Sequence, residues 1–95
     1  MVMDNEGEIH FMTQDKTNLV KIYRVNNDAE MGEDAFFQVV YTLQSKWVYF
    51  FLYNNEQEVF YLMDESKRVR VLKQDPKTKK FNLTQQFEIP KAEKE

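Results

Sequence analysis

The amino-acid sequence predicts an all-β protein, a single-domain antiparallel meander of about seven short strands. Aromatic residues, which favour strands, make up 15% of the chain. Apolar and polar residues alternate with a period of two in several segments, and short runs containing Asn, Asp or Pro separate those segments. The 95 residues suffice for one hydrophobic core. Such a meander closes as a small barrel or a two-layer sandwich.

The β domain is expected to span residues 8–90, with a frayed N-terminus at 1–7 and a disordered tail at 91–95. Its first two strands are predicted at 8–13 and 19–25, where β-forming residues flank a turn that contains Asp and Asn. Neither face of the second strand is cleanly polar, which indicates that it is covered on both sides or lies at a corner of a sheet.

The densest aromatic stretch of the chain follows a polar loop at 26–34. Segments 36–43 and 47–53 are predicted to pair as a hairpin through a turn at 44–46, because β-branched and aromatic residues flank a short polar break. The second segment is apolar on both of its faces, so it is expected to lie between two layers or under a partner.

A helix over residues 34–45 is the alternative to the first strand of this hairpin. Asp34 would cap that helix, and one stripe would hold Phe36, Val39, Val40 and Leu43. The fold would then be α+β. The density of β-branched and aromatic residues favours the strand.

Three further strands are expected in the C-terminal half, at 58–63, 68–72 and 81–89. In the second of these, alternation predicts that Val69 and Val71 point inward while Arg68 and Arg70 point outward. The predicted core combines the largest apolar residues of these strands with those of the aromatic stretch: Trp47, Phe51, Tyr61, Val69, Val71, Phe81, Leu83 and Phe87.

The sequence indicates no enzyme, no cofactor and no metal site. The chain has no cysteine, which excludes disulfides and thiolate ligands. His10 is the one histidine, and neither serine, Ser45 nor Ser66, follows the glycine pattern of a nucleophile elbow. The carboxylate clusters lack the spacing of a calcium loop. The acidic N-terminus does not resemble a signal peptide, and no apolar run is long enough for a membrane helix, so we expect a cytoplasmic protein.

The expected function is protein binding, in the first instance self-association as a dimer. Strands that are apolar on both faces exceed what one small sheet can bury, and large exposed apolar patches mark contact sites. The residues predicted for this interface are Val48, Phe50, Phe60 and Leu62.

An uneven charge distribution supplies a second hypothesis. Residues 1–66 carry four Lys and Arg against twelve Asp and Glu, whereas 67–95 carry nine against four. The sequence therefore predicts a basic ridge that could bind the phosphate backbone of a nucleic acid: Arg68, Arg70, Lys77, Lys79 and Lys80. A third hypothesis is the binding of a small apolar ligand inside a barrel.

Overall fold

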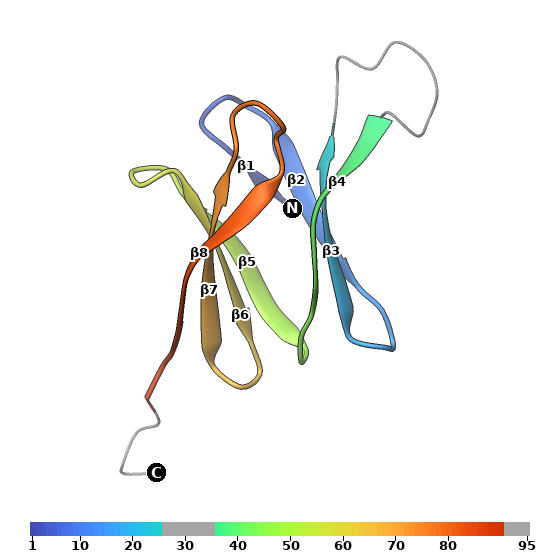
Figure 1. The fold of residues 1–95 in the computed structure, drawn as a ribbon, viewed down its shortest axis with the longest axis vertical. Helices are drawn as coiled ribbons and strands as arrows, with labels where there is room; N and C mark the ends of the chain where they lie inside the picture. Colours follow the sequence, from blue (N-terminus) through green and yellow to red (C-terminus); the bar gives the residue numbers. More distant parts are fainter. Residues whose placement is uncertain (26–35, 91–95) are drawn as a thin grey trace.

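The computed structural model describes residues 1–25 and 36–90, and these residues form eight β-strands in two four-stranded antiparallel sheets. The sheets face each other as the two layers of a sandwich and do not close into a barrel (Figure 1). This confirms the all-β prediction. The loop at 26–34 and the tail at 91–95 that the sequence analysis predicts lie outside the described residues.

Each sheet is a meander in which consecutive strands pair. The N-terminal sheet consists of β1 (Val2–Met3), β2 (Ile9–Gln14), β3 (Leu19–Val25) and β4 (Phe37–Gln44). The C-terminal sheet consists of β5 (Val48–Asn54), β6 (Val59–Asp64), β7 (Arg68–Gln74) and β8 (Phe81–Glu88). Residues 1–7 are not frayed as predicted, because Val2 and Met3 pair with β2.

Tight turns within the sheets share one construction. Each begins with an Asp or Asn whose side chain accepts hydrogen bonds from backbone N–H groups of its own turn: Asp4, Asp15, Asn54, Asp64 and Asp75. Each also contains a residue with positive φ: Gly7, Asn18, Glu58, Lys67 and Lys79. The side-chain cap holds the turn even where the left-handed residue is not glycine.

The predicted hairpin between 36–43 and 47–53 is wrong, because β4 and β5 belong to different sheets. The chain crosses between the layers at 45–47, and Gln14 of β2 holds this crossover. Its Nε2 donates to the carbonyl oxygens of Ser45 (3.0 Å) and Lys46 (3.1 Å), while its Oε1 accepts from the N–H of Val48 (2.9 Å). The alternative helix is also wrong where the structure describes it, since 37–44 is a strand.

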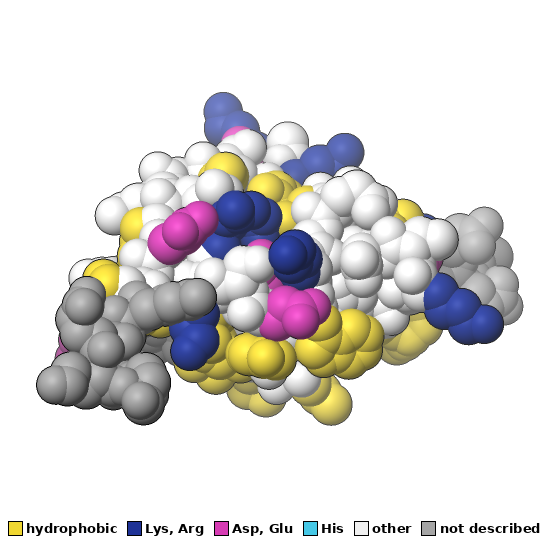
Figure 2. Space-filling view, turned by 90° about the horizontal axis from the view of Figure 1, so that it is seen from below, with side chains coloured by type: hydrophobic (Ala, Val, Ile, Leu, Met, Phe, Trp, Pro, Cys, Tyr) yellow, Lys and Arg dark blue, Asp and Glu magenta, His cyan; other side chains and the backbone are white. Residues whose placement is uncertain are grey.

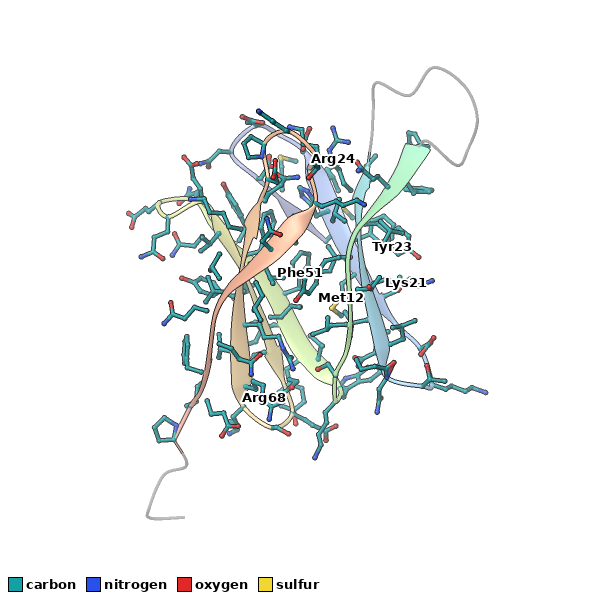
Figure 3. The ribbon with its side chains drawn as sticks, viewed as in Figure 1. Met12, Lys21, Tyr23, Arg24, Phe51 and Arg68 are labelled. Atoms are coloured by element: carbon teal, nitrogen blue, oxygen red, sulfur yellow. The ribbon has the colours of Figure 1, made fainter. Side chains whose placement is uncertain are left out.

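The hydrophobic core fills the space between the sheets. Met12 of β2 and Phe51 of β5 point toward each other across it (Figure 3). Its buried residues come from both layers: Val20, Ile22, Val40, Val48, Phe60, Leu62, Leu72 and Phe81.

The predicted core is correct in part. Phe81, Val69 and Val71 are buried, whereas Trp47, Leu83 and Phe87 are exposed, with 54%, 46% and 44% of their surface accessible. A register shift between Val48 and Phe50 changes which residues of β5 face inward, and β8 extends beyond the cover of the other sheet.

Candidate protein-binding surface

The residues predicted for a protein interface do not share a free surface. Val48, Phe60 and Leu62 are buried in the core between the sheets, so that part of the prediction is wrong. The reason is that the second sheet covers the face on which they lie. Phe50 is half-buried and pairs with Met63, on the opposite face of the C-terminal sheet.

That outer face of the C-terminal sheet is apolar. Leu72 of β7 points into the core, so Val69 and Val71, which lie on the other face of this strand, point outward. The prediction that these two valines point inward is therefore wrong. Their cross-strand neighbours extend the face over all four strands: Phe50, Leu52, Tyr61, Met63, Gln85 and Phe87. These neighbours cover the two valines, which are only 7% and 8% exposed. An antiparallel sheet with one face in water is expected to be polar on that face.

The strand β8 borders this face and is itself uncovered. It ends the strand order of its sheet, and residues 82–88 are exposed on both faces. Figure 1 shows its C-terminal end running away from the N-terminal sheet. No charged residue occurs between Phe81 and Phe87. We refer to β8 together with the outer face of β5–β7 as the C-terminal surface.

Hydrophobic side chains are unevenly distributed over the molecule. Seen from below, they gather most densely along one side, while the rest of that view is mainly backbone and uncharged polar side chains with scattered Lys, Arg, Asp and Glu (Figure 2). The large exposed hydrophobic residues of the C-terminal sheet and its borders are Trp47, Tyr49, Leu52, Leu83, Phe87 and Ile89.

The outer face of the N-terminal sheet carries a smaller aromatic cluster. Phe11 stacks on Tyr23 with ring centroids 5.0 Å apart and meets Phe37 edge-on at 5.6 Å. Lys21 lies on the same face of β3 as Tyr23 (Figure 3). Phe11 and Tyr23 are half-buried by this packing, whereas Phe37 remains 45% exposed.

The predicted basic ridge does not form. Arg70 is buried between the sheets rather than pointing outward, and Arg68 pairs with Glu88 at 3.4 Å. Arg68 begins β7, whereas Lys77, Lys79 and Lys80 follow the far end of that strand. The five cations are therefore spread over the interior and two separate ends of the sheet, which removes the geometric basis for a phosphate-binding strip.

Arg70 belongs to a buried polar cluster beneath the crossover. Its Nη1 lies 3.5 Å from Asp64 Oδ2 and 3.4 Å from Ser45 Oγ, and the Ser45 hydroxyl donates to Asp64 Oδ2 at 3.2 Å. The other carboxylate oxygen of Asp64 accepts from the N–H groups of Ser66 and Arg68 in its turn. Sequence patterning places an arginine outward, whereas the carboxylate of Asp64 on the preceding turn and the hydroxyl of Ser45 in the crossover make its burial favourable.

His10 occupies the opposite end of the core. It is fully buried, and its ring contacts Phe60 and Phe81. Gln74 Nε2 donates to the carbonyl of Lys79 and lies 3.4 Å from His10 Nε2. Since the amide nitrogen is a donor, it can bond to His10 Nε2 in the tautomer that carries its proton on Nδ1, and among the described residues Nδ1 is buried without a hydrogen-bond partner. Burial lowers the pKa of His10, so the neutral form prevails.

Asp4, Glu8 and His10 place potential metal-ligand atoms within 4.8 Å of one another. Glu8, however, accepts a two-point hydrogen bond from the Arg24 guanidinium, at 3.0 and 2.9 Å, and Lys79 Nζ lies 3.9 Å away. The bond from Arg24 lowers the pKa of Glu8. A cation here would compete with two fixed positive charges for the same carboxylate, so the cluster is better suited to an internal ion pair than to a metal.

An adjacent pocket of about 240 Å³ is open and of mixed charge. Carboxylates from Asp4, Glu6 and Glu58 and ammonium groups from Lys73 and Lys79 line it. It does not match the apolar barrel cavity that the sequence analysis considered, because ligand sites are typically apolar with few polar groups.

Within the described residues, no helix has the length and apolar character needed to cross a membrane. Comparisons of this chain with protein-family models, with curated proteins and with solved structures give no match.

Proposed function

We propose that this protein is a non-enzymatic protein-binding module that associates first with itself, and that the C-terminal surface is its contact surface. The proposal depends on one observation. β8 exposes Leu83 and Phe87 on opposite faces, and it lies at a sheet edge beside an apolar outer face.

Exposing this much apolar surface is unfavourable in water. Burial of apolar area contributes about 25 cal/mol per Å², and a sheet face of four strands by seven residues covers roughly 400 Å² in projection. That is the size at which the largest apolar patch of a monomer is often functional, about 300–600 Å². Self-association removes such a surface without requiring another protein.

The test compares two substitutions of matched character. Phe87→Lys places a charge in the C-terminal surface, whereas Val39→Lys places one at a similarly exposed position, 40% accessible, on the outer face of the N-terminal sheet. Sedimentation velocity over a range of protein concentrations measures association, and far-ultraviolet circular dichroism checks that each variant is folded. We expect the wild type and Val39→Lys to associate and Phe87→Lys to remain monomeric.

Two results would overturn the proposal. One is a wild-type protein that stays monomeric at millimolar concentration. The other is association that survives Phe87→Lys but is lost in Val39→Lys, which would transfer the contact to the N-terminal sheet.

A further inference from the structure

The sandwich is open along one side, where β4 and β8 come close without pairing. Each is the last strand of its sheet and, among the described strands, pairs with one neighbour only. A groove of about 170 Å³ lies there, lined by residues 39–42 of β4 and by Lys80, which precedes β8. We propose that this groove binds the C-terminal end of an extended segment of another protein. The segment adds to β4 as an antiparallel strand, with its terminal carboxylate beside Lys80.

The free backbone of β4 can accept such a strand. In an antiparallel ladder, every second residue of the last strand directs its N–H and C=O groups away from the sheet. Proteins commonly protect such an edge with Lys, Pro or an inward-pointing charge. From Phe37 to Gln44, β4 contains none of these. Val40 forms a bulge opposite β3 that interrupts the ladder, so we expect the added strand to pair along residues 41–44.

The opening is closed at the end nearer the start of β4. Gln38 Nε2 donates to the carbonyl oxygen of Thr78 at 3.2 Å, and Gln38 Oε1 accepts from Arg24 Nη1 at 3.0 Å. These bonds hold the loop before β8 against β4. Further along, β8 runs away from the N-terminal sheet, so the opening widens toward Gln44 (Figure 1). A strand antiparallel to β4 therefore enters at the wide end and reaches its C-terminus near Gln38.

Charge complementarity identifies the group that fits this closed end. Lys80 is the one charged residue that lines the groove, and its side chain is exposed. Among the described residues it has no ion-pair partner. A terminal carboxylate supplies a negative charge and two acceptor oxygens at the point where the strand ends.

The core side of the opening favours apolar side chains in the partner. Leu83 lies on the core-facing side of β8, opposite Leu72, yet 46% of its surface is accessible. Across the opening, Tyr41 and Leu43 of β4 are half-buried. Every second side chain of an added strand points between the sheets toward these residues, where burial of an apolar group is favourable. The expected partner therefore has apolar residues at alternate positions before its C-terminus.

A synthetic peptide tests the inference, which goes beyond the proposed function because β4 is not part of the C-terminal surface. The probe has six residues of alternating valine and threonine, an N-terminal fluorescein and a free C-terminal carboxylate. Fluorescence anisotropy should show saturable binding with a dissociation constant below about 1 mM. The same peptide with a C-terminal amide should bind roughly fivefold more weakly, because it lacks the charge that pairs with Lys80. A peptide methylated on its backbone nitrogens should not bind, because it cannot donate to the β4 edge.

Two variants locate the carboxylate. Lys80→Gln should weaken binding of the carboxylate peptide roughly fivefold and leave the amide peptide unchanged, so that both peptides bind alike. Lys77→Gln is the matched control, because Lys77 is an exposed residue of the same loop that does not line the groove. It should bind both peptides as the wild type does. Far-ultraviolet circular dichroism checks that each variant is folded.

Four results would overturn the inference. They are no saturable binding below about 1 mM, equal binding of the carboxylate and amide peptides to the wild type, equal losses in Lys80→Gln and Lys77→Gln, and retained binding of the methylated peptide. Phe87→Lys separates this groove from the C-terminal surface, because it should bind the peptide as the wild type does. Binding lost in Phe87→Lys but kept in Lys80→Gln would move the peptide to the C-terminal surface. Failure of self-association, by contrast, leaves the groove as described.

Discussion

Replacing Asp64 by Ala should be among the most destabilising single changes in this protein. The carboxylate is 1% exposed and accepts four hydrogen bonds, two from its own turn, one from Ser45 and one from Arg70. Its removal leaves the Arg70 guanidinium, in a residue that is 7% exposed, without this carboxylate. Breaking a buried ion pair from one side costs roughly 3–5 kcal/mol, a large part of the about 5–15 kcal/mol that stabilises a domain.

Two comparisons isolate the cause. Asp15→Ala removes a turn cap of the same design, in which Oδ1 accepts from Thr17 and Leu19, but no buried arginine depends on it. Its effect should be clearly smaller than that of Asp64→Ala. In the double variant Asp64→Ala/Arg70→Met no buried charge is left over, so it should be more stable than Asp64→Ala alone.

Urea unfolding followed by circular dichroism gives the free energy of unfolding for each variant. A loss below about 1 kcal/mol for Asp64→Ala would show that the buried cluster is not desolvated as described. A double variant less stable than Asp64→Ala would refute the argument that the stranded Arg70 charge is the source of the cost.

Two other predictions concern the ends of the core. Because the folded chain holds His10 neutral while the unfolded chain binds a proton below pH about 6.5, stability should fall as the pH drops through that value. Thermal melts from pH 7.5 to 5.5 should show this fall in the wild type and a flatter profile in His10→Phe; equal slopes would contradict it. Gln14→Ala should cost about 1–3 kcal/mol in urea unfolding, because three backbone groups of the crossover lose their partner. An unchanged midpoint would show that Gln14 does not hold the crossover.

Local patterns in the sequence predict much of the fold. The Asp and Asn residues that open the turns, and the alternating segments between them, locate strands such as β3 and β7. These features depend on neighbours within a few residues, where backbone propensity and turn chemistry act. The all-β class follows from them.

What the sequence does not reveal depends on distant partners. Residues 44–46 look like a hairpin turn, and the crossover is explained only by Gln14, more than thirty residues earlier. The orientation of β7 is ambiguous because valines and arginines alternate, and Asp64 and Ser45 decide that Arg70 faces inward. Three of the predicted interface residues, Val48, Phe60 and Leu62, therefore face the core instead of a partner. The exposure of β8 depends on how far the opposite sheet extends.

Hydrogen exchange at two protein concentrations tests the central claim most directly. Dilute protein, at about 5 µM, and concentrated protein, at about 500 µM, differ in the fraction that self-associates, because mass action favours association at the higher concentration. The backbone N–H groups of β8 that do not bond to β7 should exchange more slowly in the concentrated sample, while those of β2 and β3 exchange at the same rate in both. Equal exchange of β8 at both concentrations, or protection confined to the N-terminal sheet, would contradict self-association through the C-terminal surface.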